Sequence, residues 1–177
     1  MCMSKVTWQC KSMSNTRSKD KWQKGYKIFF VGEKGETIKF PYYGFRSSLS
    51  FTAIEEKTVI LNRIYKADKT TTSGGTGWIE VQDVKYMTGF HIFPQAIQTK
   101  LYSAWYKMEN HMIFEVEYRK VSALGEHKVN TKYPVDCVIA QEMRVLRPLT
   151  YDEIQSVLDS EDKIDRTDVS RQRRNYD

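Results

Sequence analysis

The sequence has few cysteines and no long apolar run, and both absences restrict the classes of protein to which it can belong. Cys2, Cys10 and Cys137 are odd in number and none is spaced for a metal site, which argues against a disulfide scaffold. The longest apolar runs, such as residues 28–31, are far shorter than the roughly 20 residues of a membrane-spanning helix. The opening residues also lack the apolar core of a secretory signal. We therefore expect an intracellular protein that is soluble or peripheral to a membrane.

A nucleotide-binding motif is also missing. Gly74, Gly75 and Gly77 form a glycine-rich segment after the lysine and threonines of 69–72. A phosphate-binding loop needs a lysine and a hydroxyl after the glycines, at the start of a helix, but Trp78 and a strand-like segment follow here. We interpret the segment as a connection between two strands. Because a partner could order such a loop, Gly75 and Trp78 are candidate contact residues.

The basic charge is concentrated at the start of the chain. Residues 1–27 hold seven basic residues and one acidic residue, so this segment alone accounts for the formal net charge of +6 of the 177-residue chain. Trp8 and Trp22 alternate with the lysines, which suits insertion into a bilayer interface or stacking on single-stranded bases. We predict that the segment binds an anionic membrane surface and ribonucleoprotein; the alternative is a solvated basic face with two core tryptophans. The candidate binding residues are Lys5, Lys11, Arg17, Lys19, Lys21, Lys24 and Lys27, with Trp8 and Trp22.

Alternation of apolar and polar residues predicts a sheet. Strand-like segments lie at 5–13, 22–32, 58–65, 78–86, 111–121 and 133–146. The first two either pair as a basic hairpin or leave a loose basic arm. Pro94 predicts a helix over 94–108, and the capping box of Thr150 and Glu153 predicts a second, short helix. We expect an α+β fold in which one domain, residues 1–158, packs an antiparallel sheet against two or three helices, followed by a charged, flexible tail at 159–177.

The predicted helix over 94–108 has an apolar face and an aromatic face. The apolar face consists of Ile97, Leu101, Ala104, Trp105 and Met108. Tyr102 and Tyr106 point away from it, and exposed aromatic side chains at one place are typical of a contact surface. We therefore take Tyr102 and Tyr106, together with Gly75 and Trp78, as candidate self-association residues. The alternative is that a loop of the same domain covers the two tyrosines.

The sequence offers weak candidates for catalysis. Glu115 and Glu117 lie two apart on a predicted strand, and with Asp136 they could hold a divalent metal as in small nucleases. The alternative is an exposed strand face on which charges alternate. No histidine is spaced for metal binding, and Cys137 lies in a segment that predicts a buried strand. We expect no catalytic residue, no metal and no cofactor.

A short, basic chain with a lysine-rich start and an α+β domain resembles the matrix proteins of rhabdoviruses, particularly the small ones of the plant-infecting cytoplasmic group. The segment "KVTWQCKSMSNTR" at 5–17 looks like the opening strand of that family. The chain departs from the family in having no Pro-Pro-x-Tyr motif, since its prolines all stand alone, and its start is shorter than the arm of the animal-virus relatives.

The resemblance implies a structural protein of the virion. Such a protein would self-associate, bind the viral nucleocapsid and its RNA, and lie peripherally on anionic membrane in the host cytoplasm, without a cofactor. Two alternatives belong to other classes. One is an RNA-binding module, such as a coat protein or silencing suppressor, and the other is the metal-dependent nuclease of Glu115, Glu117 and Asp136.

Overall fold

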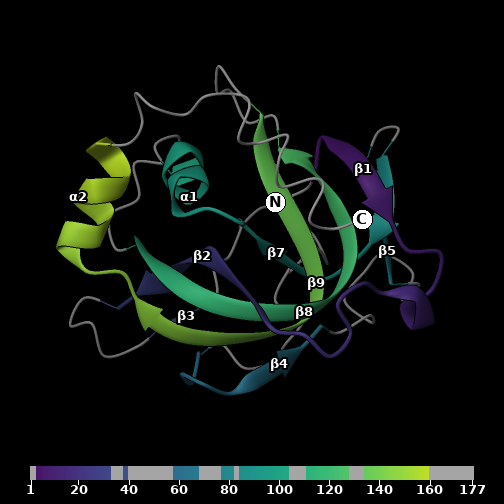
Figure 1. Cartoon of the computed structure of the whole chain (residues 1–177), viewed down its shortest axis with the longest axis horizontal. Coiled ribbons are helices and arrows are strands. Elements are labelled where there is room, and N and C mark those ends of the chain that lie inside the picture. Colours follow the sequence, from purple (N-terminus) through teal and green to yellow (C-terminus); the bar gives the residue numbers. More distant parts are fainter. Residues whose placement is uncertain are drawn as a thin grey trace.

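The computed structural model describes residues 3–32, 38–39, 58–67, 77–81, 84–103, 111–127 and 134–159. Within these ranges, seven strands form one antiparallel sheet in the order β3-β2-β8-β9-β4, with β1 paired to β8 and β7 paired to β9 (Figure 1). Two further strands, β5 and β6, form a separate hairpin. The α+β prediction is therefore confirmed in its coarser form, because the fold is mostly antiparallel sheet with few, short helices.

The centre of the sheet is a pair of long strands. β8 (His111–His127) and β9 (Val135–Pro148) run antiparallel along nearly their whole length. Alternate side chains of β8 enter the core, as the sequence predicts, and Phe114, Val116 and Tyr118 are almost fully buried. This alternation leaves the intervening charged side chains on the outer face of the sheet.

The basic start of the chain is part of the sheet, and it forms neither of the two arrangements left open by the sequence, the hairpin or the loose arm. β1 (Lys5–Gln9) and β2 (Gln23–Val31) do not pair with each other; both pair antiparallel with β8, one after the other along the same edge. Between them, Arg17 alone forms a bridge to Val121. The hairpin prediction is wrong because β8 is long enough to accept both strands in succession. The residues between the paired positions are displaced from the ladder as two loops.

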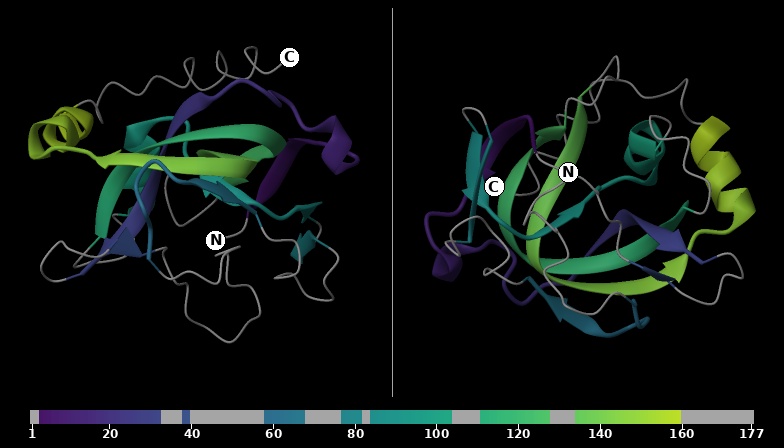
Figure 2. Two further views of the ribbon diagram at one scale, coloured as in Figure 1. Left: turned by 90° about the horizontal axis from the view of Figure 1, so that it is seen from below. Right: turned by 180° about the vertical axis from the view of Figure 1, so that it is seen from behind.

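The sheet closes on itself at its other side. β7 (Phe90–Ile92) pairs with β9, and the next residue, Phe93, exchanges two backbone hydrogen bonds of 2.8 and 2.9 Å with Tyr26 of β2. Gly25 lies at this closure, where an added Cβ would be 2.6 Å from the side chain of Ile92. The larger apolar core is formed mainly by side chains of this closed sheet. Figure 2 shows the sheet from two further sides.

Four short strands complete the two sheets. β3 (Ile38–Lys39) pairs with the end of β2, and β4 (Ile64–Lys66) pairs with β9. The predicted strand over 58–65 is instead broken by a turn, because Asn62 adopts a left-handed conformation with φ of 64°. The predicted strand over 78–86 is also wrong in detail: it is a hairpin of β5 (Trp78–Val81) and β6 (Val84–Met87).

Both predicted helices are present within the described residues. The described part of the helix expected over 94–108 is α1 (Ala96–Ser103), and η1 (Met13–Asn15) is a single turn of 3₁₀ helix in the first loop. α2 (Tyr151–Asp159) begins after the predicted capping box, which is confirmed. Thr150 N donates to Glu153 Oε2 at 2.7 Å, and Glu153 N donates to Thr150 Oγ1 at 3.2 Å. The remainder of the predicted charged tail lies outside the described residues.

Candidate functional site

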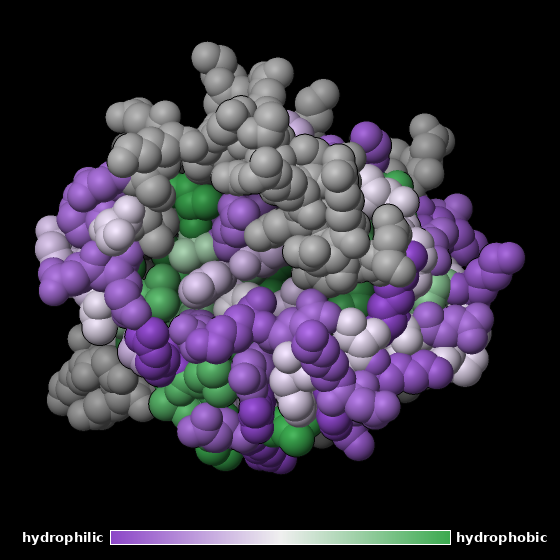
Figure 3. Space-filling model, in the orientation of Figure 1, coloured by the Kyte–Doolittle hydropathy of each residue, from purple (hydrophilic) through white to green (hydrophobic). Residues whose placement is uncertain are grey.

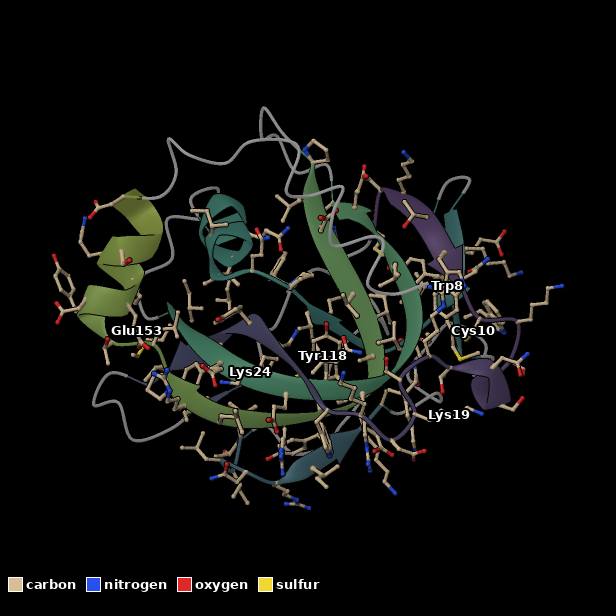
Figure 4. The ribbon with its side chains drawn as sticks, viewed as in Figure 1. Trp8, Cys10, Lys19, Lys24, Tyr118 and Glu153 are labelled. Atoms are coloured by element: carbon tan, nitrogen blue, oxygen red, sulfur yellow. The ribbon has the colours of Figure 1, made fainter. Side chains whose placement is uncertain are left out.

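The basic residues of the first 27 positions lie at several places along the edge of β8. Lys5 is on β1, Lys11 is in the loop after it, and Lys19 and Lys21 are in loop 18–22; all four are exposed. Figure 4 shows Lys19 in the loop beside η1, away from Trp8 of β1. The cations therefore project from a strand and from two loops that β8 holds in place, and not from a loose arm.

Loop 18–22 is tied to β8 by its backbone. Ser18 has φ of 53° and Lys120 of β8 has φ of 57°, and Lys120 N donates to Ser18 O at 3.3 Å. On one side, Arg17 and Val121 exchange two backbone hydrogen bonds of 2.9 Å. On the other side, Gln23 Nε2 donates to Ser18 Oγ at 2.6 Å. These contacts fix where Lys19 and Lys21 emerge.

Trp22, at the end of this loop, lies among cations from the long strands. The guanidinium carbon of Arg119 is 4.5 Å from the centre of the indole ring, and that of Arg144 is 4.8 Å away. Each of the two is also held by a carboxylate, since Arg119 Nε donates to Glu142 at 2.7 Å and Arg144 Nε donates to Glu117 at 2.6 Å. Cation–π contacts of this kind fix the ring and the cations together.

Glu142 holds two of these cations. Its side chain is only 4% exposed, and it accepts from Arg119 Nε and, at 2.6 Å, from Lys120 Nζ. Burial raises the pKa of this carboxyl, but the hydrogen bonds from Lys120 and Arg119 outweigh that effect and the pKa is lowered. Glu142 is therefore ionised at neutral pH, and its single negative charge leaves one positive charge of the pair Arg119 and Lys120 uncompensated.

Together these residues form a surface that we call the basic face. It combines the first 27 residues with two strands from the second half of the chain, and its carboxylates are Asp20, Glu117 and Glu142. Its five cations are Lys19, Lys21, Arg119, Lys120 and Arg144. Arg119, Lys120 and Arg144 are not among the binding residues predicted from the sequence. The outward position of Arg119 follows from the alternation of β8, but no local signal places the loop of Trp22 beside it.

Trp8 is also covered by a guanidinium group. The guanidinium carbon of Arg17 is 3.9 Å from the centre of its ring, and the half-buried indole packs against the larger apolar core. Both candidate tryptophans, Trp8 and Trp22, are thus held within the protein surface. A groove of about 580 Å³ runs beside β1, lined by residues 4–9 and by Lys85 of β6.

Two lysines of the predicted set are not available as free surface cations. Lys27 is 8% exposed, and its Nζ donates to the backbone carbonyl of His91 at 2.8 Å. Burial lowers the pKa of Lys27 to about 8. The prediction that Lys27 contacts a membrane or ribonucleoprotein is therefore wrong, because β2 directs this residue into the interior. Lys24 is exposed but forms an ion pair of 3.1 Å with Glu115.

The interior near Lys27 contains a group of polar side chains. His91 Nε2 and the Tyr86 hydroxyl are 3.2 Å apart, and the rings of His91 and His127 are 5.8 Å apart. Cys137 is buried nearby, as predicted, and burial raises its pKa to about 12 although Lys27 lowers it. A thiol with so high a pKa is protonated at neutral pH, whereas a nucleophilic cysteine must be a thiolate.

The three acidic residues of the nuclease hypothesis do not come together. Glu117 is paired in register with Arg144, whereas Asp136 is paired with Glu126 at the far end of the same ladder. Eight residues of β9 separate these rungs, which corresponds to about 27 Å along the strand. Glu115 is bound to Lys24 and Arg147. Within the described residues, no group of three His, Cys, Asp or Glu side chains is arranged to hold a metal ion.

The candidate self-association residues are only partly described. Trp78 is half-buried on β5. Tyr102 lies in α1, but its side chain, together with all of Gly75 and Tyr106, is outside the described residues. The glycine-rich loop up to residue 76 is outside them as well.

No protein-family model, no curated protein and no solved structure matches this chain. Among the helices that the structure describes, none combines the length and the apolar character needed to cross a membrane.

Proposed function

We propose that the protein is a non-enzymatic structural protein that acts as a viral matrix protein. In this proposal it lies on anionic membrane in the host cytoplasm and in the virion, associates with itself, and holds ribonucleoprotein against the membrane during assembly. The observation that carries the proposal is the basic face, in which loop 18–22 and the cations of β8 and β9 surround Trp22. The gathering of exposed cations on an ordered surface favours a polyanionic partner.

The contact would be electrostatic. Near an anionic membrane each basic residue contributes about 1 kcal/mol, and the attraction falls off within a Debye length of about 10 Å at 0.1 M salt. Trp8 and Trp22 are covered by guanidinium groups, so insertion of either ring would first require these contacts to open. We therefore expect adsorption that salt reverses, without deep insertion of an aromatic anchor.

Vesicle flotation tests this proposal. Lys19→Glu and Lys21→Glu each change the charge of the basic face by two, which should weaken binding to phosphatidylserine-containing vesicles by about 2 kcal/mol, or roughly 30-fold. Lys85→Glu is the charge-matched control, since Lys85 is an exposed lysine on the β5–β6 hairpin. It should change binding less than threefold. Equal losses in the variants and in the control, or no flotation of the unaltered protein at low salt, would contradict the proposal.

RNA binding without a membrane role is the second candidate function. The groove beside β1 favours it, because Trp8, Lys5 and Lys85 line it, and a base could stack on Trp8 once the guanidinium of Arg17 is displaced. Fluorescence anisotropy with a single-stranded oligonucleotide measures it. If the protein binds RNA tightly and in a salt-sensitive way but does not bind anionic vesicles, the RNA-binding function replaces the matrix proposal.

A further inference from the structure

Large apolar side chains are exposed at two separate places among the described residues. Ile60, Leu61 and Ile64 are 55%, 39% and 45% exposed and lie together at the entry to β4. The fourth, Tyr151, is 78% exposed at the start of α2. In Figure 3 the lower margin of the molecule, where Figure 1 places β4, shows this apolar group at the surface. Clustered exposed apolar side chains mark contact surfaces more often than single ones do.

The surface at β4 is apolar and basic. β4 is an outer strand of the sheet, and within the described residues it pairs with β9 alone. Arg63 and Lys66 are exposed beside the apolar group, and residues 58–67 include no acidic residue. Lys66 lies opposite Glu142 in the ladder, but that carboxylate already accepts from Arg119 and Lys120. This surface therefore suits a partner that is apolar and acidic.

The surface at α2 has the complementary character. Tyr151 lies beside Asp152, and both are exposed, as is Asp159 at the other end of the helix. The nine residues of α2 include three carboxylates and no cation. Glu153 is engaged by Arg147 at 2.7 Å, which leaves Asp152 and Asp159 as the acidic groups that face solvent.

We propose that β4 of one copy of this chain binds α2 of a second copy. Ile60, Leu61 and Ile64 would pack against Tyr151, with Arg63 and Lys66 facing Asp152 and Asp159. α2, the yellow helix, and β4 lie apart in all views (Figures 1 and 2), so one copy has one surface of each kind to offer. A contact between two different surfaces is head-to-tail and continues from copy to copy into rings or filaments. This inference rests on the self-association in the proposed function and names its surfaces.

The test is sedimentation velocity over a range of concentrations, without lipid or RNA. The unaltered protein should form species larger than a dimer as its concentration rises. The β4 variant, Arg63→Glu with Lys66→Glu, and the α2 variant, Asp152→Lys with Asp159→Lys, should each associate at least tenfold more weakly. Ser14→Glu with Asn15→Glu, on the exposed turn η1, is the control and should associate as the unaltered protein does. Ile60→Ser and Tyr151→Ser repeat the test without charge reversal. The interface can therefore still be tested if the charge-reversal variants fail to fold.

Mixing the two variants gives the decisive result. The β4 variant keeps an intact α2 and the α2 variant keeps an intact β4, and the two altered surfaces are again of opposite charge, so a mixture should recover the assembly that neither variant shows alone. If the α2 variant instead assembles alone as the unaltered protein does, two β4 surfaces bind each other and the head-to-tail inference is wrong. A protein that stays monomeric up to about 100 μM also overturns it. Vesicle flotation of the α2 variant is a separate readout, so unchanged assembly with flotation intact would refute this interface and not membrane binding.

Discussion

Ser18 and Lys120 face each other where loop 18–22 meets β8, and both have a left-handed backbone conformation. Their φ angles are 53° and 57°, and Lys120 N donates to Ser18 O at 3.3 Å. For a residue with a Cβ this conformation costs roughly 1–2 kcal/mol. The neighbouring backbone hydrogen bonds between Arg17 and Val121 offset that cost. The strained pair sets the position from which Lys19 and Lys21 leave the sheet.

Replacement of Lys120 separates this strain from the charge of the side chain. Lys120→Gly and Lys120→Ala both remove the ion pair with Glu142, but glycine adopts a left-handed conformation without penalty. We expect Lys120→Gly to be more stable than Lys120→Ala by about 1 kcal/mol in urea unfolding. The two variants should lose the same amount of binding to anionic vesicles. Equal stability would show that residue 120 is not held in a left-handed conformation in solution.

The local features of this fold could be predicted from sequence, and the pairings could not. The alternation of β8 and the capping box at Thr150 are set by neighbouring residues, and both are confirmed. Whether β1 pairs with β2 or with β8 depends on contacts more than 100 residues apart, for which one sequence offers no local signal. The basic face likewise combines features that could and could not be predicted. Its loop lysines were predicted from the sequence, but Arg119 and Arg144 lie beside them only because of the strand register.

Lys27 shows how a charge count alone can mislead. It belongs to the basic run, yet it lies two residues before Phe29, which is fully buried on the same strand. Side chains two apart on a strand share a face, but residues 28–31 are all apolar and do not alternate with polar ones, so the sequence alone does not show which face Lys27 takes.

Lys27→Met should therefore stabilise the protein. Burial lowers the pKa of Lys27 from 10.5 to about 8, so at neutral pH the folded state holds a charge that the interior disfavours, while methionine loses only the hydrogen bond to His91. We expect the free energy of unfolding at pH 7 to rise by about 2 kcal/mol. Flotation with anionic vesicles should stay within twofold of the unaltered protein.

The pH dependence provides the check on this prediction. The unfolded chain binds more protons than the folded one between pH 8 and 10.5, so the unaltered protein gains stability as pH rises through that range. The difference from Lys27→Met should therefore shrink toward pH 10. A difference that is constant with pH would mean that lost packing or a new contact, and not the buried charge, is responsible.

His91 should make the protein less stable in mild acid. Burial, with further contributions from the nearby His127 and Lys27, lowers its pKa well below 6.5, so the folded state keeps the ring neutral while the unfolded chain takes up a proton. The stability that depends on the neutral ring is complete above about pH 6.5 and is lost as pH falls below that value, by at most about 1.4 kcal/mol per pH unit.

His91→Gln should flatten this dependence between pH 7.5 and 5.5 in urea unfolding. Tyr86→Phe removes the same hydrogen bond of 3.2 Å but no group that titrates in this range, so it should keep the full slope. If His91→Gln keeps the slope as well, the proton is taken up elsewhere, with His127 the nearest candidate.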